Sequence, residues 1–243
     1  MRKSLSFFIP VYNEEGLLIQ NTEKLIAFVD TLDVPYEIIL CSNGSTDRTI
    51  ELGYALEQTY PTKVRFFFVK EKGVGKALKH CIIHFKYPYI LSLDMDLSAD
   101  LSFIKEGLGF LNKYDIVLGS KRIGVQYRKI IRKLGSGLYV FIVRLLLGIG
   151  YSDYSLGAKI YKKVILERYT GLISDYGTDY VINIVYHAFK DGYRIIEIPV
   201  ICFDNRGSRF HLVREGMYRY KKVFELWLKN KKLLLVKSTY PFF

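Results

Sequence analysis

The first half of the chain alternates short apolar segments with longer segments of helical periodicity. The apolar segments, each typical of a buried strand, are residues 5–10, 36–40, 63–69, 89–93 and 114–120. Helices are expected between them, at about 14–31, directly after 45–46, and at 73–85. Strands that are apolar at nearly every position and are joined by helices are typical of a parallel sheet covered on both faces. We therefore predict an α/β fold with a mainly parallel sheet flanked by helices.

Polar residues mark where the first two helices are expected to begin. Asn13 is placed to cap the helix predicted from Glu14 to Thr31. Ser45 or Thr46 can cap the helix that follows the second strand.

The second half of the chain is less regular. A basic amphipathic helix is expected at residues 128–148 and a further helix at 178–190. Residues 157–166 and 193–203 are typical of strands, and residues 212–236 predict a basic amphipathic helix or a pair of helices.

Composition excludes some classes of protein. Hydrophobic residues make up 50% of the chain, which is enough for a sizeable core and excludes a disordered protein. The formal net charge of +12 favours a polyanionic partner (nucleic acid, anionic lipid head groups or phosphorylated small molecules), although a solubilising lysine-rich surface would carry the same charge. Cys41, Cys81 and Cys202 lack zinc-ligand spacing, so we expect a reducing, cytoplasmic compartment.

No segment is expected to cross a membrane. The longest apolar run, residues 138–150, contains Arg144. It is shorter than the ~20 residues of a spanning helix. The apolar run near the N-terminus is broken too early for a signal peptide.

The stretch LSLDMDLSAD, residues 91–100, ends the fourth predicted strand with Asp94 and Asp96. Ligands of open parallel sheets bind beyond the carboxyl ends of the strands. Two neighbouring carboxylates repel each other and raise each other's pKa, and a divalent cation removes that cost. The pair therefore favours a Mg²⁺ or Mn²⁺ site that anchors a diphosphate, whereas the simpler alternative is a solvated turn that caps a helix.

Other polar groups are expected at the same edge of the sheet. Pro10, Tyr12 and Glu14 follow the first strand, where an aromatic ring and an acid can stack on a nucleobase and hydrogen-bond to it. The stretch CSNGSTD adds small polar groups after the second strand, and KGVGKA places Lys72 and Lys76 near a helix start that can hold phosphate. Ordinary turns and helix caps are the alternative for each stretch.

Five stretches together resemble glycosyltransferase family 2, the inverting enzymes of GT-A fold: FFIPVYNEE, SNGSTDRT, GVGKALKHCI, LSLDMDLSAD and VLGSKR. Three more look like the branch of dolichyl-phosphate mannose synthase and polyprenyl-phosphate glycosyltransferases: YSDYSLGAKIYKKVIL, YGTDYVINIVYHA and RIIEIPVICFDNRGSRF. The resemblance covers roughly residues 4–215. It implies a Rossmann-like GT-A catalytic domain at 1–212, with a nucleotide-sugar half at about 1–122 and an acceptor half at about 123–212, followed by a basic amphipathic helical tail at 213–243.

The resemblance also implies roles for residues at matching positions. The implied donor-binding residues are Pro10, Tyr12, Glu14, Ser42, Asn43, Lys72, Asp94, Met95 and Asp96. The implied metal ligands are Asp94, Asp96 and Ser98, with Ser98 standing where relatives often have a glutamine. The implied acceptor and phosphate contacts are Arg122, Arg132, Lys159 and Arg209. The expected catalytic residues are Asp94, Asp96, Arg122 and Asp179, the last at an acidic position on the acceptor side.

Two positions depart from the family pattern. Ser42 stands where the family often has the acid that reads the base, which leaves GDP and UDP both open. Ala158 stands where the branch commonly has an aromatic residue.

The resemblance implies transfer of a hexose from a GDP- or UDP-sugar to a polyprenyl or dolichyl phosphate. Such a phosphate is largely ionised near neutral pH, so it needs cations around it rather than a strong general base. A hydroxyl acceptor is the alternative, and it would need a carboxylate base, for which Asp179 is the candidate. A nucleic-acid binder is disfavoured because carboxylates would lie at the centre of its site, and an inactive sugar-nucleotide-binding scaffold is a further alternative.

The lipid acceptor implies contact with an anionic membrane surface. One apolar helical stretch is preceded by four cations, Arg128, Lys129, Arg132 and Lys133. The tail carries further cations together with Phe224 and Trp227. Basic amphipathic helices with aromatic residues lie in the interface of anionic membranes, although helices that pack on the core have the same pattern. We expect a peripheral enzyme on the cytoplasmic face.

Overall fold

A computed structural model describes residues 3–127, 130–174, 179–203 and 212–239. The chain forms two compact units, each built from two segments. The first unit consists of Met1–Tyr127 and Ser152–Asp204, and the second of Arg128–Tyr151 and Asn205–Phe243.

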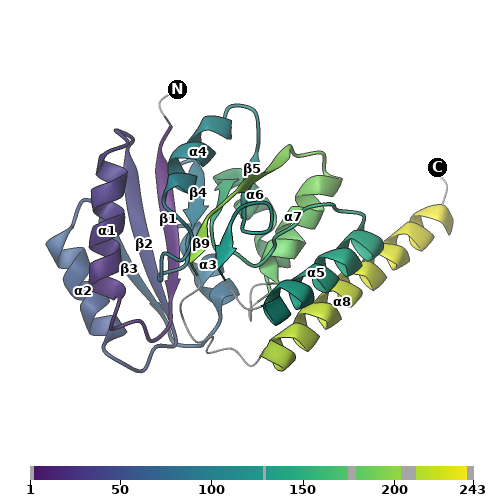
Figure 1. Cartoon of the computed structure of the whole chain (residues 1–243), viewed down its shortest axis with the longest axis horizontal. Helices are drawn as coiled ribbons and strands as arrows, with labels where there is room; N and C mark the ends of the chain where they lie inside the picture. The colour runs from purple at the N-terminus through teal and green to yellow at the C-terminus, as the bar shows by residue number, and fades with distance from the viewer. Residues whose placement is uncertain (1–2, 128–129, 175–178, 204–211, 240–243) are drawn as a thin grey trace. The chain divides into compact units, whose positions relative to one another are not determined.

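The first unit is built on a seven-stranded sheet with the strand order β3-β2-β1-β4-β7-β5-β8 (Figure 1). In that order the strands are Val64–Val69, Tyr36–Asn43, Leu5–Val11, Tyr89–Ser92, Lys159–Lys162, Ile116–Ser120 and Ile195–Pro199. Every neighbouring pair is parallel except the two that include β7, which runs antiparallel between β4 and β5. The predicted α/β fold with a mainly parallel sheet is confirmed.

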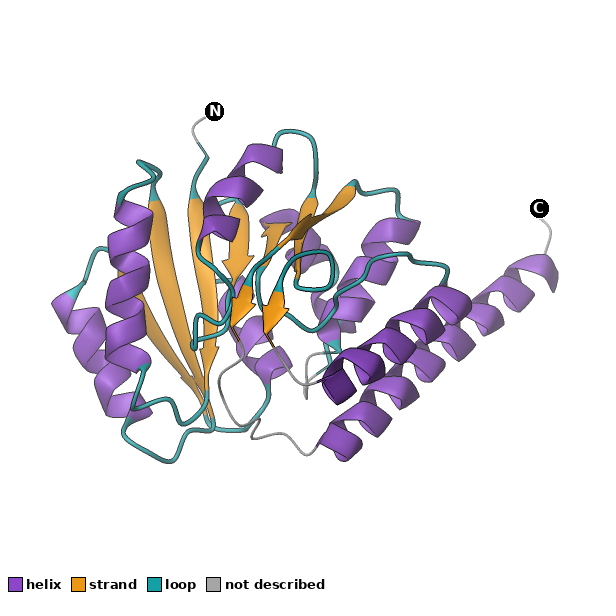
Figure 2. Cartoon of the chain, in the orientation of Figure 1, coloured by secondary structure: helices purple, strands orange, loops and turns teal. Residues whose placement is uncertain are grey.

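Helices flank the sheet on both faces (Figure 2). The helices of this unit are α1 (Leu18–Asp30), α2 (Thr49–Thr59), α3 (Val74–Ile82), α4 (Ser102–Phe110), α6 (Lys163–Arg168) and α7 (Tyr180–Lys190), with a 3-10 turn, η1, at Thr170–Leu172. Two short strands, β6 (Gln126–Tyr127) and β9 (Cys202–Phe203), pair in a second sheet.

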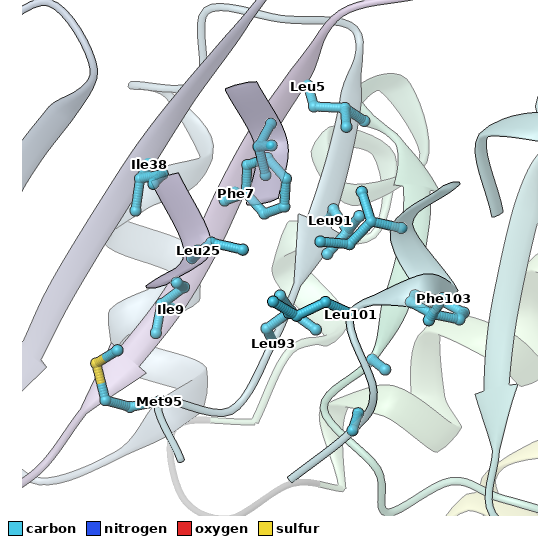
Figure 3. Packing of buried hydrophobic residues seen from close by; sticks show 14 of the residues in the cluster. Leu5, Phe7, Ile9, Leu25, Ile38, Leu91, Leu93, Met95, Leu101 and Phe103 are labelled. Atoms are coloured by element: carbon cyan, nitrogen blue, oxygen red, sulfur yellow. The ribbon is translucent and has the colours of Figure 1, made fainter. Parts of the chain in front are cut away.

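The core explains why β1 is apolar at almost every position. Leu5, Phe7 and Ile9 lie on the face covered by α1, where they pack with Leu25 and Ile38 (Figure 3). Phe8 points to the opposite face, where its ring makes an edge contact with Phe85 at 6.2 Å. Because both faces of this strand are covered, an alternating polar pattern would leave polar groups buried.

The predicted starts of the first two helices are wrong. Asn13 has a φ of 53°, and its Oδ1 accepts a hydrogen bond from the Thr46 N–H at 2.8 Å, whereas α1 begins only at Leu18. Asn13 therefore links the loops after β1 and β2 instead of capping a helix. Ser45 Oγ accepts the Asn13 N–H, and Asp47 Oδ1 accepts the N–H of Thr49, the first residue of α2.

The second unit contains the two predicted amphipathic helices, α5 (Ile130–Leu147) and α8 (Leu212–Thr239). They pack on each other, and the rings of Tyr139 and Tyr220 lie 5.7 Å apart. The C-terminal segment forms one helix and not two. In the described ranges, neither these helices nor any other is both long enough and apolar enough to cross a bilayer.

Candidate active site

The order of strands places a topological switch point between β1 and β4. The chain moves outward from β1 to β2 and β3 on one side and to β4 on the other, so β1 and β4 flank the topological switch point. Their pairing ends with Phe8 and Ser92. Pro10 and Asp94 come two residues later on the two strands, at the edge where open α/β sheets bind ligands.

The Asp94–Asp96 segment forms a tight turn. The Leu97 N–H donates to the Asp94 carbonyl at 3.1 Å, and Leu97 has a φ of 46°. The Ser98 N–H donates to Asp96 Oδ1 at 3.0 Å. The backbone therefore holds both carboxylates and the Ser98 side chain on one short turn.

Gly157 approaches Asp94 more closely than any other residue type could. Its N–H donates to Asp94 Oδ2 at 3.0 Å, and a Cβ at position 157 would lie 2.6 Å from the carboxylate. The absence of a side chain at position 157 is therefore a requirement of this site.

The surroundings of Asp94 disfavour its charged form. Asp94 is exposed to solvent on one side, but protein atoms around its carboxylate replace part of its hydration. This desolvation raises the pKa of Asp94, and the charge of Asp96 raises it further. The Gly157 N–H and the charges of Lys121 and Lys159 oppose this rise. A cation bound between the two carboxylates would relieve both the desolvation and the repulsion.

The donor atoms of this turn fit a hard divalent cation. Asp94, Asp96 and Ser98 provide only oxygen atoms, which Mg²⁺ and Mn²⁺ prefer. In the part of the chain that the structure describes, no group of three or more His, Cys, Asp or Glu residues could hold a metal. The remaining ligands of a cation here would be water and substrate oxygens, as is usual for Mg²⁺.

Lys159 lies beneath this turn and not at the surface. It is fully buried in β7, and its ammonium donates to the Leu156 carbonyl. Burial lowers the pKa of Lys159 to about 8, against the opposing effect of Asp153 and Asp94. The predicted direct contact with a substrate phosphate does not fit this position, because the side chain is enclosed by protein.

A buried charge network that the sequence analysis missed surrounds Lys159. Lys121 Nζ lies 3.8 Å from Asp153 Oδ2 and donates to Ser155 Oγ at 3.2 Å. Burial alone would raise the pKa of Asp153, but Lys121 and Lys159 hold it below its usual value. Glu197 on β8 also belongs to the network, and its signal in the sequence was an acid inside the apolar run IIEIP.

On the donor side, the residues after β1 meet the loop before α3. Lys72 Nζ lies 3.6 Å from the centroid of the Tyr12 ring. Tyr12, Pro10 and Glu14 are partly accessible, and the Glu14 N–H donates to Thr49 Oγ1 at 2.8 Å. Lys76 forms an ion pair with Glu71, so a second cation lies near the same helix start.

Three of the predicted donor-binding residues are buried. Ser42 Oγ donates to Ser45 Oγ at 2.9 Å. The Asn43 side chain donates to the Val11 carbonyl and accepts the Gly73 N–H, which joins the ends of β1 and β2 to the start of α3. Met95 is buried, and its carbonyl accepts a hydrogen bond from Asn21. In this geometry Ser42 and Asn43 join neighbouring loops through hydrogen bonds, and contact of all three side chains with a donor stays a prediction.

The acceptor-side residues are only partly described. Arg122 follows β5 and is partly accessible, and its N–H donates to Ser120 Oγ at 3.2 Å. Asp179 is buried just before α7, where its Oδ1 accepts the Ser174 hydroxyl at 2.7 Å. Arg132 lies on α5, but its side chain is outside the described residues, as is all of Arg209.

A protein-family model described as "Glycosyl transferase family 2" matches residues 6–170. Glycosyltransferase AglD of Haloferax volcanii is 25% identical over 235 residues, which is 92% of this chain and 37% of that protein. An undecaprenyl-phosphate 4-deoxy-4-formamido-L-arabinose transferase of Edwardsiella ictaluri is 27% identical over 81% of this chain and 59% of its own length. A dolichyl-phosphate beta-glucosyltransferase, ALG5D, of Trichomonas vaginalis is 27% identical over 65% of this chain and 53% of its own length.

The chain thus spans between 37% and 59% of the lengths of these relatives. Among solved structures, glucosyl-3-phosphoglycerate synthase of Mycobacterium tuberculosis, in complex with Mn²⁺, UDP and phosphoglyceric acid, has a TM-score of 0.69 at 16% identity. The match covers 93% of this chain and 78% of that one. At this identity the likeness shows the fold alone.

Proposed function

The chain belongs to glycosyltransferase family 2, and we propose that it transfers a hexose from a GDP- or UDP-sugar to a polyprenyl phosphate, with inversion at the anomeric carbon. The family and the GT-A fold are those that the sequence predicted. The single observation that carries the proposal is the accessible pair Asp94 and Asp96 beyond the switch point between β1 and β4. The activity of any longer protein that contains this chain is part of the same proposal.

Several of the protein's own residues would hold the donor. Tyr12 and Lys72 offer an aromatic face and a cation side by side, which suits a base and a phosphate. Asp94, Asp96 and Ser98 would hold Mg²⁺ or Mn²⁺, and this cation would neutralise the charge that develops on the diphosphate leaving group. One structural neighbour was solved in complex with UDP, and GDP and UDP both remain part of the proposal.

The acceptor class is proposed by analogy with two relatives, an undecaprenyl-phosphate 4-deoxy-4-formamido-L-arabinose transferase and a dolichyl-phosphate beta-glucosyltransferase. A phosphate nucleophile is already largely ionised near pH 7, so the protein has only to place cations around it. Arg122 is the proposed contact in the first unit, where it would lower the repulsion between the donor and acceptor anions, and Arg132 and Arg209 stay predictions of the family resemblance. Lys159, being buried, would act through Asp94 and not by touching the acceptor.

A lipid acceptor requires approach to a membrane. The proposed surface consists of the basic amphipathic helices α5 and α8, which would lie in the interface of an anionic membrane on its cytoplasmic face. Exposed apolar side chains on these helices, among them Phe141, Leu145 and Phe224, support this proposal.

The second candidate is transfer to a sugar or glycolipid hydroxyl. Asp179 favours it, because a buried carboxylate near an acceptor could serve as the general base. Replacing Asp179 by Asn separates the two reactions. A hydroxyl acceptor predicts a loss of turnover of roughly 10²-fold or more, whereas a phosphate acceptor predicts a small loss.

The deciding experiment uses purified protein, a panel of labelled GDP- and UDP-sugars and a short polyprenyl phosphate, with Mn²⁺ or Mg²⁺ and with EDTA. We expect metal-dependent label in the organic extract that mild acid releases. Donor hydrolysis without a lipid product would contradict the phosphate acceptor and favour the hydroxyl reaction. Binding of the donor without any transfer would instead identify a scaffold.

A further inference from the structure

The loop from Ser152 to Gly157 donates five backbone N–H groups to three carboxylates in succession. The first two, from Ser152 and Asp153, go to Glu197 at 2.9 and 2.8 Å. Those of Ser155 and Leu156 go to Asp153 Oδ1 at 2.8 and 3.2 Å. The last, from Gly157, goes to Asp94. The loop is therefore a chain of hydrogen bonds that leads from β8 to the turn after β4.

Glu197 fixes the beginning of the loop. Its Oε1 also accepts the Ser152 hydroxyl at 2.7 Å, and the same hydroxyl lies 2.8 Å from Ser120 Oγ at the end of β5. Ser152 is thus tied to two neighbouring strands of the sheet. A side chain on a strand is a more rigid anchor than one on a loop, so the loop starts from a fixed point.

Asp153 fixes the middle of the loop, and Lys121 balances its charge. Both side chains are buried. The Asp153 carboxylate accepts the Ser155 hydroxyl at 2.9 Å in addition to the backbone groups, and Lys121 donates to the same hydroxyl. A buried network with its hydrogen bonds satisfied is rigid and permits one arrangement.

Gly157 transmits this arrangement to Asp94. Its N–H donates a hydrogen bond to Asp94 Oδ2, so the loop fixes the position of this carboxylate. Its carbonyl accepts the Ser92 hydroxyl, which connects the loop to β4. Among the described residues, the only hydrogen bond to this carboxylate is the one to Oδ2, so Oδ1 remains available to a cation.

Stability alone is a weak reason for such a network. Replacing buried ion pairs by apolar residues of similar volume is often neutral or stabilising. Groups that orient metal ligands, in contrast, change metal affinity by roughly 10- to 100-fold when they are altered. We infer that Glu197, Asp153 and Lys121 are positioning residues that orient Asp94 toward a divalent cation, an inference that rests on the cation site of the proposed function.

The test measures Mn²⁺ affinity directly, by electron paramagnetic resonance titration of the whole chain, with and without UDP. Glu197→Gln keeps the size of the side chain but removes the negative charge to which the Ser152 and Asp153 N–H groups donate. We expect roughly tenfold weaker Mn²⁺ binding in this variant. Lys121→Met should act in the same direction. Ser155→Ala removes only one hydroxyl from the network, and it tests the inference with a milder change if the other variants fold poorly.

Glu37→Gln is the matched control. Glu37 is a buried carboxylate that accepts the Ser6 hydroxyl and the Lys86 N–H, but it lies near the start of β2, away from the carboxyl ends of the strands. This variant should lose stability and keep its Mn²⁺ affinity. In the Glu197 and Lys121 variants, transferase activity should also recover when Mn²⁺ is raised about tenfold, which a partly unfolded enzyme would not do.

The outcomes separate the two proposals. Mn²⁺ binding by the wild type with unchanged affinity in Glu197→Gln, Lys121→Met and Ser155→Ala would overturn the positioning role alone. Weakened binding in Glu37→Gln to the same degree would also overturn it, because loss of stability would then explain the effect. A wild-type protein that binds no Mn²⁺ even with UDP would overturn the cation site itself and this inference with it.

Discussion

The ammonium of Lys72 lies 3.6 Å from the centre of the Tyr12 ring, which joins the loop after β1 to the loop before α3. The backbone of Lys72 packs closely against Gly44, since a Cβ at position 44 would lie 2.8 Å from the backbone nitrogen of Lys72. The position of this cation is therefore set by two loops that both border the proposed donor site.

The first prediction concerns this pair. Lys72→Ala should weaken UDP binding about fivefold, which corresponds to roughly 1 kcal/mol, the usual contribution of an exposed cation to an anion or to an aromatic ring. Isothermal titration calorimetry with UDP measures it. Lys70→Ala is the control, since Lys70 is exposed nearby and should leave the affinity unchanged. Equal losses in both variants would mean that only the general positive charge matters.

The second prediction concerns Gly157. A methyl group at this position would collide with the Asp94 carboxylate, so Gly157→Ala should abolish metal-dependent transfer and destabilise the fold by about 1–3 kcal/mol. Chemical denaturation and the transfer assay measure these effects. Gly109→Ala is the control, because a Cβ there meets nothing within 4 Å and α4 should gain about 0.5–1 kcal/mol. An active Gly157→Ala enzyme would show that the carboxylate can move freely.

The third prediction concerns the metal. Since desolvation by the surrounding protein atoms and the charge of Asp96 raise the pKa of Asp94, the folded state binds more protons than the unfolded state, and stability falls as pH rises above the ordinary pKa of an aspartate. Asp94→Asn should therefore raise the free energy of unfolding at pH 7 in EDTA. In Mn²⁺ with UDP the order should reverse, because only the wild type gains binding energy, about 2.7 kcal/mol at a hundredfold excess over Kd.

Thermal unfolding of both proteins in EDTA and in Mn²⁺ checks this reversal. Asp100→Asn is a suitable control, because Asp100 lies a few residues further along and its carboxylate accepts the Ser102 N–H at the start of α4, away from the turn. A stabilising effect of Mn²⁺ that persists in Asp94→Asn would place the cation elsewhere.

The fourth prediction concerns Lys159. Burial lowers its pKa to about 8, whereas an unfolded lysine titrates near 10.4, so the unfolded state binds more protons between these values. The contribution of Lys159 to stability should therefore rise as pH increases from about 8 to about 10. Urea denaturation of the wild type and of Lys159→Met across this range measures it, and the difference between the two should move in favour of the wild type. A constant difference would mean that Lys159 keeps its ordinary pKa in the folded protein.

The parallel part of the fold could be predicted because β1, β2 and β4 are apolar at almost every position, which a sheet covered on both faces requires. The antiparallel direction of β7 could not, since its four residues carry no signal of direction and their place depends on pairing with β4 and β5. The predicted start of α1 was wrong because the Asn13 side chain accepts a hydrogen bond from the backbone of the loop after β2. Local capping rules do not include such a long-range hydrogen bond.

In the candidate site, too, some residues could be predicted from the sequence and others could not. Asp94 and Asp96 could be identified from their place after a strand and from the family pattern. Lys121, Asp153 and Glu197 could not, because each is far from Asp94 in the sequence and they are connected to it only through the folded loop Ser152–Gly157. The burial of Lys159 could not be predicted either, because it follows from the central position of β7 in the sheet.

The chain leaves the first unit at Tyr127 and returns to it at Ser152. The intervening segment is thus an insertion with respect to the sheet, since none of the sheet's strands lies within it. During evolution such a segment can lengthen, shorten or be exchanged without shifting the register of any strand or breaking the hydrogen bond between Gly157 and Asp94. Under the proposed function, selection for a new acceptor can therefore act on the insertion while the proposed donor site is inherited unchanged.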